Sequence, residues 1–461
     1  MYYILNKNIA LRSWRLIPHA YYSKLLPTAR YLTKAEFDLL LKCDGKTDVE
    51  QTPLLECLEN KGIIARCNKN EKQLTIWQRY RHCDNRYFPK MNWMITSKCN
   101  YNCLHCFNAI DNSPLQNEWT YGEAEKLLDE AMKCGIHAFT LTGGEPMAHK
   151  DFLKIVKGIY ERGMYVEEIN TNGFFLNQKI LDSFKEISCN PILKISFDCL
   201  GFHDWMRNRA GAEKDAIRAI ELCIENGFKV KVQTNINKVN VNSLLKTMEF
   251  LDSIGVAETR IIKTTETPRW IQNAKQETLE IEEYFDCVLN FVNEYIKKER
   301  NMSINAWQFL SINPLNKTYC LNPVLCNKGD YRDSIPVCIT NRGMIAVAAN
   351  GGVYPCHQTS GIYEAKGIKV ENVKNKSLQE ILQYGDYLDE ICRTVGNLKS
   401  VNDECGICKY FQYCLGGCRA VAMIHTNDKN GIDPTKCAFF KKGYHEKIFE
   451  MLKEWNSQTI L

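Results

Sequence analysis

The sequence predicts an α/β protein with three units: a small N-terminal module, a partial barrel of parallel strands, and a cysteine-rich C-terminal domain. Within residues 86–310, six strand patterns alternate with amphipathic helix patterns, as in parallel strands joined by right-handed crossovers. No GxGxxG follows the first strand, which favours a partial (β/α)6 barrel over a doubly wound sheet. Within residues 311–461, cysteine and glycine become frequent and the strand patterns become short.

The composition bounds the function classes. The chain has 461 residues, 45% of them hydrophobic, and a net charge of +5. This mild basic excess does not predict nucleic-acid or membrane partners. The N-terminus lacks a signal peptide, and no stretch approaches the ~18 apolar residues of a spanning helix. We therefore expect a cytoplasmic protein, in which clustered cysteines among the 22 present indicate metal binding rather than disulfides.

Residues 1–85 are expected to fold as a winged-helix-like module. Thr33 and Glu36 form a capping box for one helix that stops at Gly45. Thr52 and the proline after it begin a second helix, which ends at Gly62 and leads into a short strand. The alternative is a plain extension packed on the barrel.

The barrel strands are expected where apolar and β-branched residues concentrate. Amphipathic helices lie between them, including one that starts at a capping box of Thr120 and Glu123. In such folds ligands bind at the carboxyl ends of the strands. The six expected strands span residues 92–97, 138–143, 166–171, 193–198, 229–237 and 259–264.

Three cysteines follow the end of the first strand. Cys99, Cys103 and Cys106 have CxxxCxxC spacing, and thiolates suit zinc or an iron–sulfur cluster. A closed zinc site needs a fourth ligand, which His105 could supply. Taken alone, the triplet leaves a zinc knuckle open as the alternative.

The next three strands also end in residues of chemical interest. The second strand runs into GGEP, where glycines let backbone approach a ligand closely. Asp198 could belong to such a site, or it could cap a helix. The candidates after these strands are Gly143, Gly144, Glu145, Asn172, Ser196, Asp198 and Arg207.

The CxxxCxxC spacing resembles that of the radical S-adenosylmethionine (SAM) superfamily, and GGEP and the S-x-D segment fall where that family places them. The resemblance covers roughly residues 90–265. It implies that the three cysteines hold a 4Fe–4S cluster whose open iron binds SAM. GGEP would hold the amino group of SAM, Asn172 could contact the cofactor, and Ser196 and Arg207 would hold its ribose and carboxylate, since a guanidinium suits a carboxylate. The implied reaction reductively cleaves SAM to a 5′-deoxyadenosyl radical that abstracts hydrogen from a substrate.

The C-terminal cysteines are similar to the seven-cysteine SPASM pattern, which carries two auxiliary 4Fe–4S clusters. By that resemblance one cluster takes Cys338, Cys356 and Cys418, with Cys320 or Cys326 as a fourth ligand. The other cluster takes Cys405, Cys408, Cys414 and Cys437. A pair of zinc-ribbon sites is the alternative. The ten cysteines outside these groups are expected to be buried small hydrophobes.

SPASM proteins mostly modify ribosomally made peptides, and the N-terminal module resembles the PqqD-like recognition element that binds a leader peptide as an added strand. The resemblance therefore implies a peptide maturase that forms a thioether or a carbon–carbon crosslink, with an external electron donor such as flavodoxin or ferredoxin.

Two alternatives remain. An anaerobic sulfatase-maturating enzyme uses an Asp just after a SPASM cysteine as its base. His357 stands there and is a possible base or a packing residue. A non-catalytic iron–sulfur protein that binds peptides or relays electrons is the second.

Overall fold

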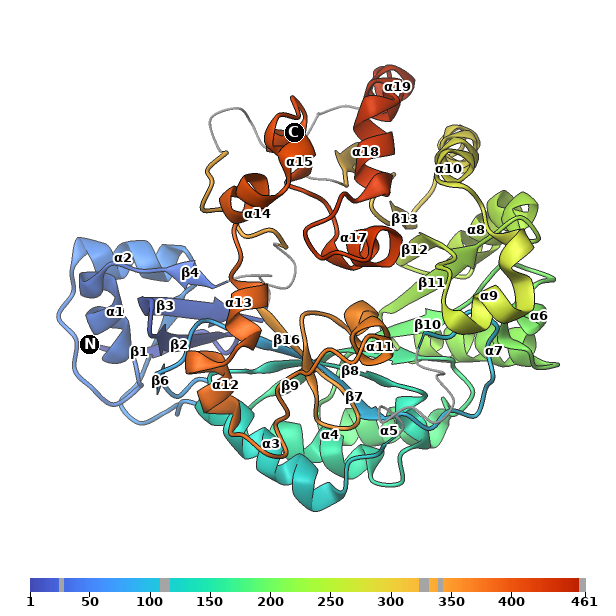
Figure 1. The fold of residues 1–461 in the computed structure, drawn as a ribbon. Helices are drawn as coiled ribbons and strands as arrows, with labels where there is room; N and C mark the ends of the chain where they lie inside the picture. Colours follow the sequence, from blue (N-terminus) through green and yellow to red (C-terminus); the bar gives the residue numbers. More distant parts are fainter. Residues whose placement is uncertain (25–28, 108–116, 323–330, 339–342, 456–461) are drawn as a thin grey trace.

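The computed structural model describes residues 1–24, 29–107, 117–322, 331–338 and 343–455. Figure 1 shows the N-terminal module at the left, a curved sheet with helices along its convex side, and the C-terminal helices over its concave side. No helix within the described ranges is both long enough and apolar enough to cross a bilayer.

The N-terminal module contains two helices and two small sheets. Both helices begin as predicted: Thr33 and Glu36 form the capping box, and Thr52 accepts a hydrogen bond from the backbone N–H of Leu55. One sheet has the order β4-β3-β2-β6, and β1 pairs with β5 separately. The elements are β1 (Tyr2–Leu5), β2 (Ile9–Trp14), β3 (Ile17–Ser23), β4 (Arg30–Tyr31), α1 (Lys34–Leu41), α2 (Pro53–Asn60), β5 (Ile64–Cys67) and β6 (Arg81–Cys83).

The first four strands were not predicted, and β2 shows why. All six of its residues are buried, including Arg12 and Ser13, so the apolar–polar alternation of a half-buried strand is missing. The guanidinium of Arg12 donates to the carbonyl oxygens of Leu11, Trp77 and Arg79, which makes its burial tolerable.

The six predicted barrel strands are all present. They are β7 (Lys90–Thr96), β8 (Ala138–Gly143), β9 (Tyr165–Thr171), β10 (Ile192–Ser196), β11 (Val230–Ile236) and β12 (Glu258–Lys263), followed by a seventh parallel strand, β13 (Ser303–Ala306). The helices between them are α3 (Tyr121–Lys133), α4 (Phe152–Glu161), α5 (Gln178–Glu186), α6 (His203–Arg207), α7 (Ala212–Glu225), α8 (Leu244–Ser253), α9 (Pro268–Ala274) and α10 (Ile281–Tyr295), and short 3-10 turns span Pro146–Ala148, Val241–Ser243 and Lys275–Glu277.

The sheet is larger than the predicted barrel. Its order is β15-β14-β13-β12-β11-β10-β9-β8-β7-β16-β17, with the strands from β7 to β13 side by side in chain order. The C-terminal domain therefore extends both edges, and β14 (Leu310–Asn313) lies across the expected boundary between residues 310 and 311. Chain order along a curved, open sheet confirms the partial barrel.

The two faces of the sheet differ. Leu193 and Ile195 of β10 and Val230 and Val232 of β11 pack in the core beneath the helices. Successive side chains in a strand point to opposite faces, so the residues between them face the concave side. We call this concave surface the inner face. Met94 of β7 packs there against residues of the C-terminal domain, including Ala348 and Met423.

The C-terminal domain is mostly helical. Its elements after β14 are β15 (Thr318–Leu321), β16 (Met344–Val347), β17 (Val353–Tyr354), α11 (His357–Ala365), α12 (Leu378–Tyr384), α13 (Tyr387–Ile391), α14 (Val395–Val401), α15 (Asp403–Gly406), α16 (Phe411–Cys414), α17 (Arg419–Thr426), α18 (Pro434–Lys441) and α19 (Tyr444–Leu452). The sequence of residues 377–396 predicts a single helix, and this is wrong, because α12 and α13 both lie in that stretch. The helix ends at Gly385, whose backbone is extended, and a new helix begins where Thr394 caps its own first turn.

Candidate cofactor and cluster sites

The cysteine loop follows β7 at the carboxyl edge of the barrel. Burial raises the pKa of Cys99 to about 12, and the charges of Cys103 and Cys106 act on it as well. The three thiols therefore lie close enough to interact. Among the described residues, no three His, Cys, Asp or Glu side chains are grouped to hold a single metal ion.

Nitrogen donors surround two of these sulfur atoms. The backbone N–H of Tyr101 lies 3.4 Å from Cys99 Sγ, and Asn172 Nδ2 lies 4.0 Å from it. Arg207 Nη1 lies 3.7 Å from Cys103 Sγ. Donors of this kind stabilise thiolates, so the surroundings suit the anionic sulfur ligands of an iron–sulfur cluster.

The glycines of GGEP serve the cysteine loop itself. A Cβ on Gly143 would lie 2.1 Å from the carbonyl oxygen of Thr96, and one on Gly144 would lie 2.2 Å from that of Lys98. From the sequence, these two glycines are expected to let the backbone approach a ligand closely. The nearest atoms are instead the backbone that leads into the cysteines. The N–H groups of Gly144 and Glu145 donate to these same two carbonyls, so the segment clamps the base of the loop.

Glu145 is completely buried. It accepts hydrogen bonds from the N–H of Met147, from Thr171 Oγ1 at 2.9 Å and from the N–H of Asn172 at 2.8 Å. Burial nevertheless raises its pKa to about 7. Thr171, which sequence reasoning did not select, fixes this carboxylate and is found only through the strand geometry.

Asn172 and Ser196 occupy neighbouring positions at the carboxyl edge. Asn172 follows β9, is 7% exposed, and donates from Nδ2 to Asn100 Oδ1 at 2.8 Å. Ser196 ends β10 and is half-buried. Both candidates therefore reach the side of the sheet where the cysteine loop lies.

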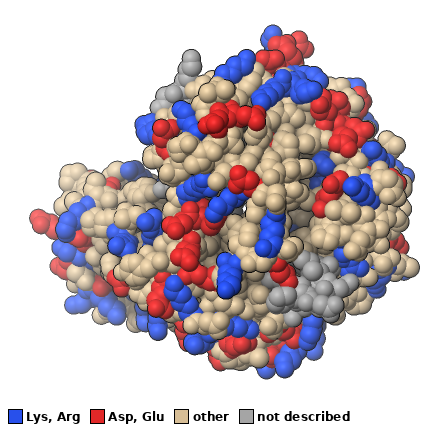
Figure 2. Space-filling view, viewed as in Figure 1, with Lys and Arg blue, Asp and Glu red and all other residues tan. Residues whose placement is uncertain are grey.

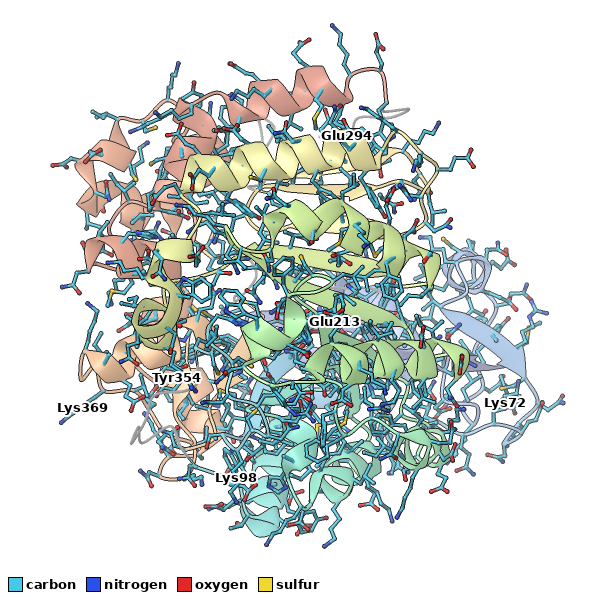
Figure 3. All side chains as sticks on the ribbon, turned by 90° about the vertical axis from the view of Figure 1, so that its right-hand side faces the viewer. Lys72, Lys98, Glu213, Glu294, Tyr354 and Lys369 are labelled. Carbon is cyan, nitrogen blue, oxygen red and sulfur yellow. The ribbon has the colours of Figure 1, made fainter. Side chains whose placement is uncertain are left out.

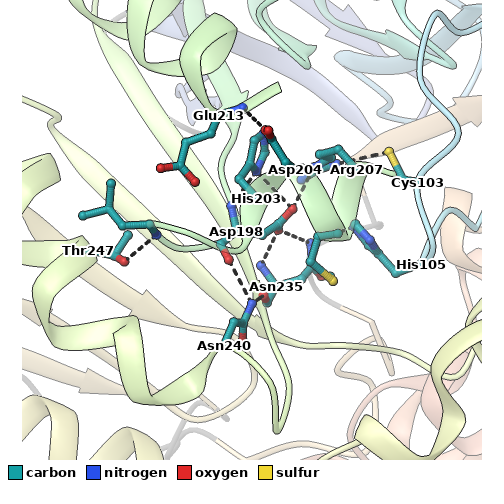
Figure 4. Close-up of polar contacts among 12 residues, drawn as sticks. Cys103, His105, Asp198, His203, Asp204, Arg207, Glu213, Asn235, Asn240 and Thr247 are labelled. Atoms are coloured by element: carbon teal, nitrogen blue, oxygen red, sulfur yellow. Dashed lines mark hydrogen bonds and ion pairs between the residues drawn. The ribbon is translucent and has the colours of Figure 1, made fainter. Parts of the chain in front are cut away.

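Asp198 pairs with Arg207 and caps no helix (Figure 4). Its Oδ2 lies 2.7 Å from Arg207 Nε, and its Oδ1 accepts from the N–H of Asn235 at 3.0 Å. The Arg207 charge and the adjacent His203 ring hold the pKa of Asp198 well below its usual range despite its burial. Arg207 thus joins a buried carboxylate to a cysteine of the loop.

Asp204 of α6 contacts the start of α7 instead. Its carboxylate accepts from the N–H groups of Gly211 and Glu213 at the start of α7, 2.7 Å each. Sequence reasoning did not select His203, Asn235 or Asp204, since none belongs to a recognisable spacing.

His105 is directed away from the role of a fourth cysteine-site ligand. Its Nε2 lies 3.3 Å from Asn235 Nδ2, and burial together with the nearby Arg207 charge lowers its pKa to about 4. The neutral ring therefore packs against the Asp198 network.

The C-terminal thiols fall into two interacting groups. The pKa of Cys418 is raised to about 12 by burial, with the charges of Cys356 and Cys338 contributing. The pKa of Cys414 is likewise raised to about 12 by burial, with contributions from Cys405, Cys437 and Cys408. The thiols that act on one another fall within the two interleaved ligand sets predicted from the sequence, and their assignment to two clusters stays a prediction.

Cys320 and Cys326 are the two candidates for a fourth ligand of the first auxiliary cluster. Cys326 lies outside the described residues. Cys320 lies in β15 and is exposed, and its Sγ is 3.5 Å from the carbonyl oxygen of Leu321. It faces the concave side with its register partner Ser311, and both line a pocket of about 220 Å³ with Asn305 and Glu258.

His357 is buried at the start of α11, immediately after Cys356. Its Nε2 lies 3.0 Å from Asn92 Oδ1 of β7, so Nε2 carries the proton, and its Nδ1 is buried without a hydrogen-bond partner among the described residues. Burial lowers its pKa to about 4. The neutral imidazole thus presents an unused lone pair beneath the first C-terminal thiol group.

The surface is mixed in charge. On the face shown in Figure 2, lysine and arginine are interspersed with aspartate and glutamate over all three units. In the view turned by 90°, Lys72 marks the N-terminal module at one side and Lys98, before the cysteine loop, lies low in the barrel (Figure 3).

Two family models match the chain. Residues 93–251 match the radical SAM superfamily, and residues 338–409 match SPASM, an iron–sulfur cluster-binding domain. The AdoMet-dependent heme synthase of Methanosarcina barkeri is 25% identical over 342 residues, covering 73% of this chain and 92% of its own length. The PqqA peptide cyclase of Granulibacter bethesdensis is 23% identical, covering 75% and 85%.

Solved structures share the fold. SuiB of Streptococcus suis, bound to precursor peptide SuiA, matches with a TM-score of 0.65 at 12% identity, over 94% of this chain and 98% of its own. The enzyme anSMEcpe, with bound AdoMet and the Cp18Cys peptide, matches with a TM-score of 0.58 at 15% identity, over 79% and 99%. The likeness to SuiB thus covers more of this chain than the likeness to anSMEcpe.

Proposed function

The chain carries a radical SAM domain followed by a SPASM domain and is a radical SAM enzyme, and from this premise we propose that it modifies a ribosomally made precursor peptide, forming a thioether or a carbon–carbon crosslink. Its cofactors are SAM, the 4Fe–4S cluster of the radical SAM domain and the auxiliary clusters of the SPASM domain. When bound, SAM and the reduced cluster would supply the chemistry of hydrogen abstraction from the substrate.

The observation that carries the proposal is the N-terminal module, which packs on the amino end of the barrel. Tyr22 Oη lies 2.9 Å from Tyr165 Oη at the start of β9, and the Tyr22 ring lies 3.7 Å from the ring of His137. Arg81 Nη2 donates to the carbonyl oxygen of Arg162. The module is thus a fixed platform, and the fold shared with SuiB, solved with its precursor peptide, spans this part of the chain as well.

The module offers an edge for strand addition. β4 is the outer strand of the four-stranded sheet, and Tyr31 is 72% exposed. The N–H of Leu32 donates to the carbonyl oxygen of His19 across the pair. Because hydrogen-bonding direction alternates along an antiparallel strand, the N–H and C=O of Tyr31 point away from β3. A leader peptide would pair with these groups.

At the barrel's carboxyl edge, the residues of this chain would bind and orient. Cys99, Cys103 and Cys106 would hold the SAM-binding cluster, with Arg207 and Asn172 donating to the cysteine sulfur atoms. Gly143, Gly144 and Glu145 clamp the loop, and Ser196 at the end of β10 is placed to face the cofactor. The two C-terminal thiol groups would hold the auxiliary clusters.

Two other functions compete. The free Nδ1 of His357 favours sulfatase maturation, because it could accept a proton beside an auxiliary cluster. The heme synthase relatives favour a tetrapyrrole substrate. The peptide proposal differs from both in requiring the N-terminal module to bind the substrate.

The test is anaerobic reconstitution with SAM, a reductant and candidate precursor peptides. We expect roughly twelve irons per chain, release of 5′-deoxyadenosine, and loss of two hydrogens from the peptide by mass spectrometry. Formylglycine in a sulfatase peptide, or turnover of an iron tetrapyrrole alone, would assign one of the competing functions. Iron without SAM cleavage would contradict turnover altogether.

The module is tested by a single substitution at its edge. Tyr31→Pro removes the outward N–H and should weaken full-length precursor binding about tenfold, whereas Tyr31→Ala keeps the N–H and controls for the ring. Peptides without the leader should bind both variants like the wild type. Equal binding of full-length precursor by both variants would contradict strand addition at β4.

A further inference from the structure

The inner face of the barrel carries charged residues that are almost all paired. Lys194 of β10 lies 2.5 Å from Glu168 of β9, and Lys231 of β11 lies 2.7 Å from Glu258 of β12. Each of these side chains is partly shielded from solvent. The charges of these two lysines and two carboxylates therefore cancel one another on the inner face.

Arg260 of β12 is the exception. No hydrogen bond or ion pair joins its guanidinium to a residue in the described ranges, and its Nε is buried without a partner. The carboxylates that act on it are Glu168 and Glu258, which the two lysines already occupy. Burial lowers its pKa. Burying a cation without a counter-ion costs free energy. A bound anion beside Arg260 would therefore be stabilising.

The side chain is held in place. Arg260 lies over the ring of Trp307, 5.7 Å from its centroid, and Tyr284 Oη donates to the carbonyl oxygen of Trp307 at 3.3 Å. Stacking on an aromatic ring fixes the plane of a guanidinium and leaves its outer N–H groups open. Arg260 remains partly exposed toward the concave side.

Strand register places Arg260 level with the cofactor residues. Ser196 pairs with Gln233, Gln233 with Arg260, and Arg260 with Asn305. Adjacent strands lie ~4.8 Å apart, so Arg260 stands roughly 10 Å along this row from Ser196. Its charge also interacts with Cys418. Arg260 thus lies between the SAM side of the barrel and the first C-terminal thiol group.

At its β13 end this row reaches a pocket that Asn305 lines and Arg260 does not. Asn305 lines the pocket of about 220 Å³ that reaches Cys320. The amides of Gln233 and Asn305 flank Arg260 on the adjacent strands and add donors beside its guanidinium. A guanidinium with flanking amide donors is the arrangement that binds a carboxylate in two-point fashion.

We propose that Arg260 binds a carboxylate of the substrate, either an acidic side chain or the chain-terminal carboxylate, and thereby selects which segment is held against the radical. The inference rests on the proposed peptide substrate. It gives the inner face a specificity-determining residue that acts on the substrate rather than on SAM.

The test uses reconstituted full-length enzyme and acetylated, amidated hexapeptides that differ only in Glu against Gln. The wild type should bind the Glu peptide about tenfold more tightly. Arg260→Gln should reduce that ratio to about one, and Arg260→Lys, a point charge without a fork, should give an intermediate ratio. Arg79→Gln, an exposed arginine of the N-terminal module, is the matched control and should keep the full ratio.

A third hexapeptide, with Gln and a free carboxyl terminus, distinguishes the two sources of the carboxylate. Equal affinity of the wild type for all three peptides would overturn the proposal, and so would a preference for a carboxylate-bearing peptide that is unchanged in Arg260→Gln. So would a loss of SAM affinity in Arg260→Gln, because the bound carboxylate would then be that of SAM. Discrimination through Arg260 without any peptide product would support this inference and contradict peptide modification.

Discussion

The two sides of the barrel's carboxyl edge differ in how their buried charges are paired. From β7 to β10 the charges are matched within the chain: Asp198 pairs with Arg207, and Glu145 accepts three hydrogen bonds. At β12 and under the C-terminal domain, Arg260 and the Nδ1 of His357 have no partner among the described residues. The first side is built to hold a cofactor that is always the same. On the proposed function, the second side leaves groups that the substrate would satisfy.

The largest effect is expected when the carboxylate that pairs with Arg207 is removed. Asp198→Asn leaves Arg207 buried without a counter-ion and should lower the free energy of unfolding by about 3–5 kcal/mol. It should also reduce the iron retained by the N-terminal cysteines, because Arg207 contacts Cys103. Denaturant unfolding and iron analysis measure both effects.

Asp198→Asn with Arg207→Met is the control, since the double variant removes both charges and should recover much of the stability. Arg260→Gln should by contrast cost little, because it removes a charge that has no counter-ion. A larger loss of stability from Arg260→Gln than from Asp198→Asn would reverse the comparison.

A smaller effect is expected from the pH dependence of Glu145. Burial raises its pKa from 4.5 to about 7. The folded state therefore favours the protonated carboxyl, and stability is greatest below the unfolded pKa and falls as the pH rises toward 7. Over that window the loss should be roughly 3 kcal/mol. Denaturation of the iron-free protein between pH 4 and 8 measures it, and Glu145→Gln should flatten the curve.

The next largest effect is expected in the segment Gly143–Glu145, which clamps the base of the cysteine loop. Gly144→Ala places a methyl group against the carbonyls of Lys98 and Ser97 and should cost about 2–3 kcal/mol. Because the displaced backbone carries the cysteines, iron loading of the radical SAM domain should fall too. Gly122→Ala in α3 meets no atom within 4 Å and should be neutral or stabilising. Normal iron loading in Gly144→Ala would contradict the clamp.

The side from β7 to β10 could be predicted from the sequence far better than the side formed by β12 and the C-terminal domain. Cys99, Cys103 and Cys106 are close in the chain, and GGEP and S-x-D follow strands that periodicity reveals, so local spacing carries the information. The pairing of Asp198 with Arg207 was not predicted, although both residues were selected. Arg260 was not selected at all. Its place depends on parallel register across β10 to β13 and on the absence of a partner, which no local pattern encodes.

The smallest effect concerns the bond that orients His357. Asn92→Leu removes the acceptor of the Nε2 proton and leaves a buried donor unsatisfied, which should cost about 1–2 kcal/mol. Asn92→Asp keeps an acceptor and should cost less. If the free Nδ1 serves the substrate, Asn92→Leu should also lower turnover more than it lowers SAM cleavage without substrate, since the ring loses its orientation. Equal reductions of both rates would make His357 a packing residue, and Arg260 would then be the one unmatched group that acts on the substrate.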